Sequence, residues 1–249
     1  MFTDNTFIFN GVPLDGLFLA ERVSRPVGAH KRFTQYPIVQ GSAINSSGYE
    51  AETIKVTGTL LGETPQEVLQ SRVKLTQVLT EPAGEVRITF PDDLGMLTYS
   101  GFYVGGCEVT GNIVNPELTL AFFIPRMIAY GATHELAITD SDKHEVVVGG
   151  TQPTYPRFSI DASKASGTVG VVITKYGADD VPDKFVKISA SAGVIVVDME
   201  RERAYTQGAS AARIDLSSDF FALTDGDKVR IMCNASSWSA RMSWEERYV

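Results

Sequence analysis

Positively charged residues, histidines and cysteines are all scarce in this sequence. Its 249 residues hold 22 Lys and Arg against 30 Asp and Glu, a formal net charge of −8 at pH 7, with 3 His and 2 Cys. Because phosphate binding needs a concentrated positive surface, this balance argues against a nucleic-acid-binding protein. Two cysteines as distant in sequence as Cys107 and Cys233 exclude a disulfide framework, and we expect both to be small buried side chains.

Long apolar runs are missing as well. No stretch approaches the roughly 20 apolar residues that a membrane span requires. The first residues include Asp4 and Asp15 rather than a basic segment followed by an apolar one, so we expect no secretory signal and synthesis in a cytoplasm. A hydrophobic share of 43% with 21% charged residues is that of an ordinary globular protein, and the length suits two domains of the usual size.

Short alternating segments separated by Gly, Pro, Asn and Asp dominate the chain. Apolar residues recur at every second position from Leu118 to Ile124 and again from Trp238 to Trp244. This spacing places them on one face of a strand, while Ser239 and Arg241 fall on the opposite, wet face. The pattern predicts half-buried strands and a mainly β protein.

Residues 64–80 have the period of a helix instead. Thr64 can be an N-cap, Pro65 stands at the first helical position and Glu67 completes a T-x-x-E capping box. Five apolar residues then recur at near-helical spacing before Pro82 ends the pattern: Val68, Leu69, Leu75, Val78 and Leu79. The segment predicts one long helix of about 16 residues, the only one expected in the chain.

A polar run at residues 139–143 indicates a change of domain. We place the boundary at residue 135, with a β domain that includes the helix and a hairpin in residues 1–135 and a second domain in 136–249. About eight short strands in about 110 residues favour a two-sheet sandwich of jelly-roll type for the second domain. They are expected at Val146–Val148, Arg157–Ile160, Val169–Thr174, Phe185–Ser189, Gly193–Met199, Ala212–Leu216, Lys228–Met232 and the final segment.

The signatures of catalysis are missing. His134 and His144 are each followed by Glu, but neither has the second His four residues later that a zinc-binding H-E-x-x-H helix requires. No G-x-S-x-G segment announces an activated serine. Asp225-Gly226-Asp227 resembles the start of a calcium loop, yet the later acidic ligands are missing, so we interpret it as a turn. We predict no catalytic residue, no metal site and no cofactor.

Two alternatives stay open at this point. The paired carboxylates of a glycosidase come from distant parts of a chain and cannot be recognised by spacing, so an enzyme remains a hypothesis. Aromatic residues such as Tyr99, Trp238 and Trp244 could stack on a sugar, although aromatics on alternating strands are more often part of a core.

Several segments follow one another in an order that resembles a known family. Phe7–Gly11 looks like an opening strand, and an Arg-containing loop at Arg22–Arg25 comes before a strand at Thr53–Leu61 and the helix at residues 64–80. Gly150–Ile160 is similar to a proline-containing loop that leads into a first strand, and Val194–Tyr205 to a hairpin with a charged turn. In this order, with Arg247-Tyr248 near the end, the features resemble the distal tail (Dit) family of long-tailed bacteriophages, the siphoviruses.

The resemblance implies an N-terminal domain that closes into a hexameric ring and a C-terminal galectin-like β-sandwich. It implies a structural component of the phage tail tip or baseplate within the virion. The implied partners are the tail tube protein, a tail-associated tip or baseplate protein and identical subunits in one ring or two stacked rings. DNA would pass through the channel without specific binding, and no membrane is involved. The chain has no room for the carbohydrate-binding insertions of longer family members.

Ring closure by one kind of subunit requires two different surfaces on each copy. We expect these surfaces in the long loop 28–49 and in the hairpin 99–108. The residues expected at the subunit interface are Tyr36, Ile38, Tyr99, Phe102 and Tyr103. The alternative function is a carbohydrate-binding β-sandwich module that recognises host cell-surface glycans.

Overall fold

The chain divides into two compact units. The computed structural model describes residues 7–24, 31–38, 41–92, 95–105, 109–111, 114, 116–207 and 211–249, with backbone alone for the strand residues within 31–49, 91–96 and 109–111. Unit 1 comprises Met1–Gly131 with Val249, and unit 2 comprises Ala132–Tyr248. The units therefore meet at 131/132, within one continuous strand, whereas the sequence places the boundary at residue 135. The polar run 139–143, on which the sequence prediction rests, follows that strand.

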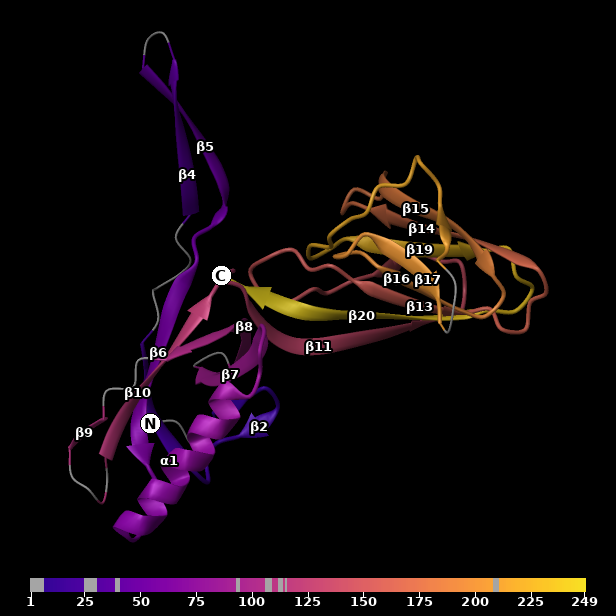
Figure 1. Cartoon of the computed structure of the whole chain (residues 1–249). Coiled ribbons are helices and arrows are strands. Elements are labelled where there is room, and N and C mark those ends of the chain that lie inside the picture. Colours follow the sequence, from indigo (N-terminus) through magenta and orange to yellow (C-terminus); the bar gives the residue numbers. More distant parts are fainter. Residues whose placement is uncertain are drawn as a thin grey trace. The chain divides into compact units, whose positions relative to one another are not determined.

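The described elements are twenty strands and one helix, drawn in Figure 1. In unit 1 they are β1 (Ile8–Phe9), β2 (Val12–Pro13), β3 (Phe18–Ser24), β4 (Lys31–Ile38), β5 (Gly41–Tyr49), β6 (Glu52–Leu60), α1 (Pro65–Thr80), β7 (Val86–Asp92), β8 (Gly95–Gly105), β9 (Val109–Gly111) and β10 (Pro116–Ile124). Strand β11 (Ala129–Ile138) begins in unit 1 and continues into unit 2. Unit 2 adds β12 (His144–Glu145), β13 (Arg157–Asp161), β14 (Thr168–Tyr176), β15 (Pro182–Ser191), β16 (Val194–Asp198), β17 (Arg203–Thr206), β18 (Arg213–Ile214), β19 (Lys228–Cys233) and β20 (Ser239–Tyr248).

Strand β8 connects two antiparallel layers of unit 1. Its residues 95–101 pair with β7, which also pairs with β1, and its residues 102–105 pair with β10. Strand β10 then pairs with β6, and β6 with β3. Gly101 stands at the change of partner, where an added Cβ would lie 2.6 Å from the Phe123 carbonyl oxygen and from Ile124 Cδ1. Only glycine allows so close an approach of the two strands.

Aromatic rings fill the core of unit 1. Phe122 is fully buried, with its ring centroid 5.6 Å from that of Phe7, 6.1 Å from Phe90 and 5.7 Å from Tyr103. Phe7 also stacks on Phe90 at 5.4 Å. Offset and edge contacts of this kind stabilise a core beyond the area that they bury. Phe122 therefore ties the opening segment of the chain to the strands β7, β8 and β10.

Helix α1 begins as the sequence predicts. The Thr64 hydroxyl accepts a hydrogen bond from the Glu67 amide at 3.3 Å, and the Glu67 carboxylate accepts one from the Glu63 amide at 2.8 Å, so two free amides of the helix start are satisfied. The helix buries Val68, Leu75 and Leu79. Leu69, which the sequence assigned to the same face, is exposed, because one position after Val68 the helix has turned by about 100°.

Residues 31–38 and 41–49 form strands where the sequence suggested a loop. Strands β4 and β5 pair antiparallel with each other from Lys31 and Tyr49 to Ile38 and Gly41. Among the described strands neither pairs with any other. The loop prediction was wrong because this segment has many small and polar residues and lacks the clean apolar alternation that identified other strands.

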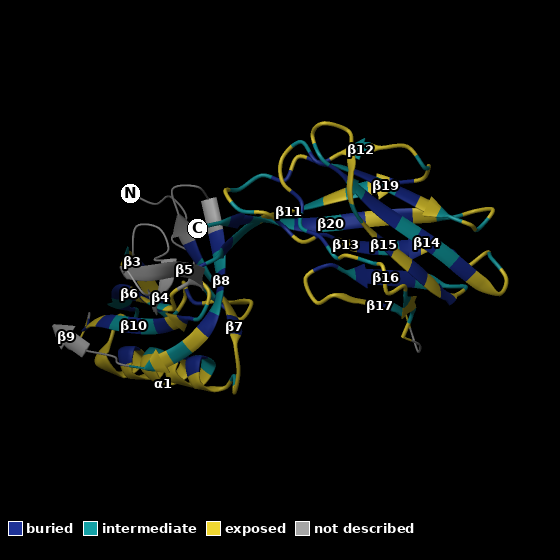
Figure 2. Ribbon diagram, turned by 90° about the horizontal axis from the view of Figure 1, so that it is seen from above, coloured by how far each residue is buried: buried dark blue, intermediate teal, exposed yellow. Residues whose placement is uncertain are grey.

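Unit 2 is the expected two-sheet β structure. One set of hydrogen-bonded strands has the order β17-β16-β13-β20-β11, and the other β12-β19-β14-β15-β18. Figure 2 shows the alternation of buried and exposed residues along strands such as β15, whose buried residues belong to the apolar core of unit 2. Met242 and Trp244 on β20 are buried in that core, as their spacing predicts.

Three predictions for unit 2 need correction. Val146 and Val148 are buried but lie after β12, because their amides donate to the turn at residues 225–227 and not to a strand. The strand expected at Ala212–Leu216 is shortened to Arg213–Ile214. Cys233 is half-buried at the margin of the core and is not fully buried, and Cys107 lies outside the described residues.

Candidate assembly surfaces

Unit 1 exposes a small apolar surface on neighbouring strands. Phe102 and Val104 on β8 are 37% and 56% exposed, and Phe123 on β10 is 38% exposed. Phe102 and Phe123 stand directly opposite each other in the strand pairing, so their side chains are neighbours on one face. We call Phe102, Val104 and Phe123 the β8–β10 patch. Contiguous exposed apolar side chains of this kind mark surfaces that become buried in an assembly.

The residues predicted for the subunit interface are distributed between core and surface. Tyr99 is 5% exposed and its ring lies 5.8 Å from that of Phe90, so it belongs to the core of unit 1 and offers little surface to a partner. Tyr103 is half-buried and packs on Phe122. Phe102 is exposed. Tyr36 and Ile38 belong to β4, whose side chains lie outside the described part of the chain.

Sequence inspection missed Val104 and Phe123 as candidate surface residues. The alternation along β10 contains the signal for Phe123, because Leu118, Leu120 and Phe122 point to the core and Phe123 must then point away. An exposed phenylalanine next to a buried one, on a strand with an otherwise regular pattern, is what distinguishes a contact surface from an ordinary wet face.

The β4–β5 ribbon is a second feature that favours assembly. Its two strands are eight and nine residues long and, within the described chain, pair with each other alone. A two-stranded ribbon is marginally stable in water, and its two outer edges carry unpaired backbone amides and carbonyls. A partner strand or surface would stabilise such a ribbon.

A polar cluster joins the beginning of β11 to the end of β20 within unit 2. His134 Nε2 donates to Glu246 Oε1 at 2.8 Å, and the Tyr248 hydroxyl donates to Glu246 Oε2 at 2.8 Å. The His134 hydrogen bond, followed by that of Tyr248, holds the pKa of Glu246 below its ordinary value. The Glu246 carboxylate raises the pKa of Tyr248 in turn. His134 also stacks on Trp244 at 5.5 Å, so it is a structural residue of unit 2.

The segment Asp225-Gly226-Asp227 is a turn that fixes neighbouring backbone. The Asp225 carboxylate accepts hydrogen bonds from the Val148 amide at 2.7 Å and the Gly149 amide at 3.3 Å. Asp227 is buried, accepts from the amide and hydroxyl of Thr224 and lies 3.2 Å from Lys175 Nζ. Gly226 has a φ of 83°. Both carboxylates are therefore used within the chain, which confirms the interpretation as a turn.

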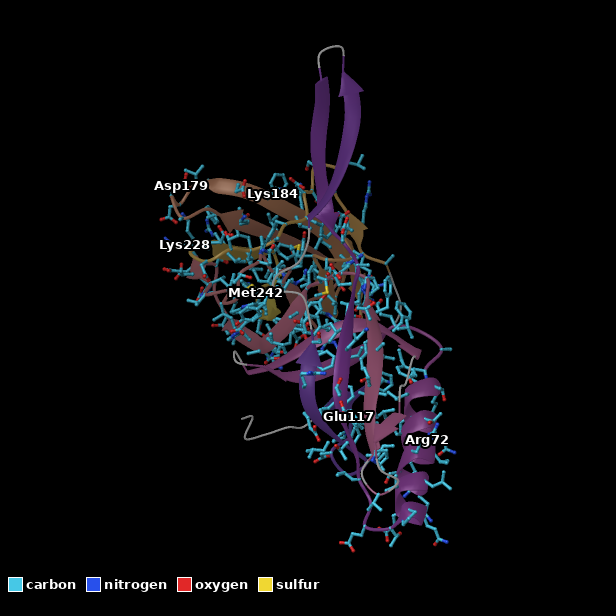
Figure 3. All side chains as sticks on the ribbon, turned by 90° about the vertical axis from the view of Figure 1, so that its left-hand side faces the viewer. Arg72, Glu117, Asp179, Lys184, Lys228 and Met242 are labelled. Atoms are coloured by element: carbon cyan, nitrogen blue, oxygen red, sulfur yellow. The ribbon has the colours of Figure 1, made fainter. Side chains whose placement is uncertain are left out.

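Ion pairs cover one end of unit 2. Asp180 lies 3.3 Å from Lys143 Nζ and 3.3 Å from Lys228 Nζ, and the hydrogen bond from Lys143 is the main cause that lowers the pKa of Asp180. Figure 3 labels Lys228 close to Asp179 at this end and Lys184 farther along the same edge. His144 pairs with Asp140 at 3.0 Å. The lysine and aspartate charges satisfy one another at the surface, where each exposed pair contributes little to stability.

The described residues contain no group of three or more His, Cys, Asp or Glu side chains that could hold a metal ion. In the same part of the chain, no helix has the length and apolar character needed to cross a bilayer. What the described residues of unit 1 offer instead is the β8–β10 patch and the self-paired β4–β5 ribbon.

Comparison with known proteins gives one family match, to part of the chain, and one shared fold. Residues 149–248 match the family model for the siphovirus-type tail component, C-terminal domain. Among curated proteins, none matches the chain.

Three solved structures share the fold of the chain. It is similar to the Dit protein of phage SPP1, a hub of the adsorption apparatus in phages that infect Gram-positive bacteria, with a TM-score of 0.76 and 20% identity over 99% of this chain and 100% of that chain. It also resembles chains of the phage P2 baseplate in its activated conformation. The calcium form gives a TM-score of 0.51 with 10% identity over 89% of both chains, and the strontium form gives 0.53 with 10% identity over 97% of this chain and 91% of that chain. Residues 149–248 are thus similar to the C-terminal domain of siphovirus-type tail components, and the whole chain shares the fold of the SPP1 Dit protein.

Proposed function

We propose that this chain forms a hexameric ring hub at the tail tip, which joins the tail tube to the tail-associated tip or receptor-binding proteins. The observation that carries the proposal is the fold similarity to SPP1 Dit, which extends over 99% of this chain. The role is mechanical, without a catalytic step, and its place is the virion. The partners are five identical subunits in a ring, a second stacked ring where one forms, the tail tube protein above and the tip protein below. The chain is made in the cytoplasm of the bacterial host.

The contacts of unit 1 support ring closure. Identical subunits close into a ring when one surface of each copy binds a different surface of the next. The β8–β10 patch supplies an apolar surface, and the β4–β5 ribbon supplies strand edges in need of pairing partners. We assign the ring contact to these two features. Of the residues expected from the sequence, Phe102 remains in the proposal, and Tyr36 and Ile38 remain in it through their position on β4.

The charge of the chain suits a channel for DNA. A net charge of −8 gives the subunit no general attraction to phosphates, so DNA would pass through a bore lined by unit 1 without binding. An outer rim that carries the acidic residues, with a bore that carries the basic ones, would contradict this part of the proposal.

The assembly state of the full chain tests the ring. Light scattering after size-exclusion chromatography and negative-stain imaging, over a range of concentrations, should show rings of six or of two stacked sixes. Phe123→Asp places a charge in the β8–β10 patch and should shift the protein to monomers, because burying an unpaired charge in an interface costs several kcal/mol. A wild-type chain that stays monomeric at every concentration would contradict the self-closing ring.

The matched control for this experiment is Phe185→Asp. Phe185 is 39% exposed on β15 of unit 2, almost the same exposure as Phe123, but lies outside the proposed ring contact. It should leave the rings intact. Rings that survive Phe123→Asp, or that dissociate equally with Phe185→Asp, would show that the ring contact lies elsewhere.

A further inference from the structure

A groove opens at the margin of the five-stranded set of strands in unit 2. It has a volume of ≈ 910 Å³ and lies between the C-terminal half of β15 and the segment that leads through β18. The side chains that define it are Thr168, Lys187, Ser189, Ser191, Arg213 and Leu216. All of these residues belong to unit 2, and nothing in the tail hub proposal uses them.

The groove forms because the side chains on the solvent-exposed face of β14 and β15 differ in size. Thr168 stands opposite Ser191 and Gly170 opposite Ser189 in the strand pairing, so the floor is made of small residues. Longer side chains border it: Lys187 precedes Ser189 on the same face of β15, and Arg213 stands opposite Ser189 on β18. Short hydroxyl-bearing residues between long ones leave a hollow whose floor can donate and accept hydrogen bonds.

Two cations border a hollow on a chain that is acidic as a whole. Lys187 Nζ lies 3.8 Å from Asp215 Oδ2, and the Lys187 side chain is 56% exposed, so this ion pair is weak. The other Asp215 oxygen, Oδ1, accepts from the amide and the hydroxyl of Ser217 at 3.0 and 2.7 Å. Lys187, Arg213 and Asp215 together carry a net charge of +1, whereas the whole chain carries −8. The groove is therefore a local positive site.

The chemistry of this lining selects a class of ligand. An arginine and an exposed lysine bind phosphate or carboxylate groups, and the row of hydroxyls suits a ligand rich in hydroxyl groups. Neutral sugars usually stack on an aromatic ring, and the described residues that line this groove include none. We propose that the groove binds an anionic saccharide or polyol, with its phosphate or carboxylate between Lys187 and Arg213 and its hydroxyl groups on Thr168, Ser189 and Ser191.

Binding of small anionic sugars to the full chain tests the proposal. Titration calorimetry or NMR with glucose 1-phosphate and with glucuronic acid should show saturable binding that weakens as salt is raised. Glucose should bind at least about tenfold more weakly, because it lacks the charge that the two cations recognise. The phosphate and carboxylate sugars together show which anionic group is preferred. Inorganic phosphate that binds as tightly as glucose 1-phosphate would indicate an adventitious ion only, and a single-stranded oligonucleotide that binds more tightly than either sugar would overturn the saccharide assignment.

Substitutions test whether the anionic sugars bind in the groove or elsewhere on the surface. Lys187→Gln combined with Arg213→Gln should weaken binding of the anionic sugars by about tenfold or more. Ser189→Phe should block the floor and abolish binding without a change of charge. The control is Lys184→Gln on the same strand, because Lys184 pairs with Asp219 at 3.1 Å outside the groove, and it should bind as wild type does.

The outcome is independent of the ring proposal. All four substitutions lie in unit 2, away from the β8–β10 patch and the β4–β5 ribbon, so the assembly state should not change. Wild-type binding by the double variant, or equal loss in Lys184→Gln, would overturn the groove assignment even where rings form. Loss of binding with Ser189→Phe, together with a thermal unfolding curve like that of wild type, would support it.

Discussion

The two units build their cores from different residues. Unit 1 packs phenylalanine rings around Phe122, and its core reaches from the opening segment at Phe7 to β10. Unit 2 relies mainly on the β-branched residues of β14, β15, β16 and β19, such as Ile173 and Ile231. An aromatic core concentrates stability in a few large contacts, whereas an aliphatic one distributes it over many smaller ones.

The surfaces of the two units differ as well. Unit 2 has several groups of polar side chains that bond to one another, namely the Glu246 cluster, the turn at Asp225 to Asp227 and the ion pairs of Asp180. Unit 1 exposes the β8–β10 patch and carries a ribbon that pairs only with itself among the described strands. The difference teaches that the apolar patch on paired strands and the self-paired ribbon, which another subunit would complete, both belong to unit 1.

The strongest test of the comparison is Phe122→Ala. Removing the central ring leaves a cavity among Phe7, Phe90 and Tyr103, so unit 1 should lose about 4 kcal/mol of unfolding free energy. Circular dichroism at 222 nm follows α1 in unit 1, and tryptophan fluorescence follows unit 2, because both tryptophans, Trp238 and Trp244, lie there. The first signal should shift to lower denaturant concentration and the second should not.

Phe123→Ala is the control for that experiment. It removes the same side chain one residue later from the exposed face of β10, and it should change unit 1 stability by less than about 1 kcal/mol. Equal shifts of both spectroscopic signals in Phe122→Ala would show that the units unfold as one and would break the distinction between the two cores.

Ile231→Ala makes the same test from the other unit. Ile231 is fully buried and stands opposite Ile173 in the pairing of β19 with β14. Its truncation should cost about 3 kcal/mol and move the tryptophan signal while the 222 nm signal stays in place. Met232→Ala, on the exposed side of the same strand, should cost about 0.5 kcal/mol or less. Similar losses of unfolding free energy from the two substitutions would mean that buried Ile231 contributes no more to the core than exposed Met232.

Acid titration tests how much the hydrogen-bonded cluster around Glu246 stabilises unit 2. The pKa of Glu246 is lower in the folded chain than its ordinary value, so its charged form stabilises unit 2 above the unfolded pKa of about 4.3 and that contribution is lost as pH falls through the lowered value. Glu246→Gln should therefore lower the unfolding free energy by roughly 1–2 kcal/mol at neutral pH, and its difference from wild type should shrink below about pH 4.

Glu135→Gln serves as the control for the acid titration. Glu135 forms only an exposed pair with Arg241, at 3.6 Å, so its removal should have an effect near zero at every pH. A difference between Glu246→Gln and wild type that persists unchanged into acid would show that the carboxylate charge does not stabilise this cluster.

The sequence predicted those elements whose signals are local. The capping box at Thr64 and Glu67 gave the first turn of α1, and period-two alternation gave β10 and β20 with their buried faces. Both patterns depend on residues only a few positions apart, so these elements could be predicted without knowledge of the tertiary structure.

The sequence could not show the features that depend on residues far apart along the chain. Tyr99 and Phe102 lie in one hairpin, and sequence treated them alike, but β8 changes its partner strand between them, which buries the first and exposes the second. The β4–β5 ribbon escaped notice because pairing between backbones, and not an apolar pattern, forms it. The groove beside Lys187 needs residues from β14, β15 and β18 together, and spacing along the chain cannot show that.

Gly101 has a consequence for the fidelity of folding. A slip of β10 by one position would bury Glu117 and Thr119 and expose Leu118, Leu120 and Ile124, so side-chain hydrophobicity already disfavours the misaligned strand. Phe122 and Phe123 alone would not, because they are identical neighbours on opposite faces. Gly101 adds a steric requirement at this end of the strand, since no Cβ fits against the Phe123 carbonyl oxygen. The absence of a side chain at one position thus helps to align the strand that carries the largest ones.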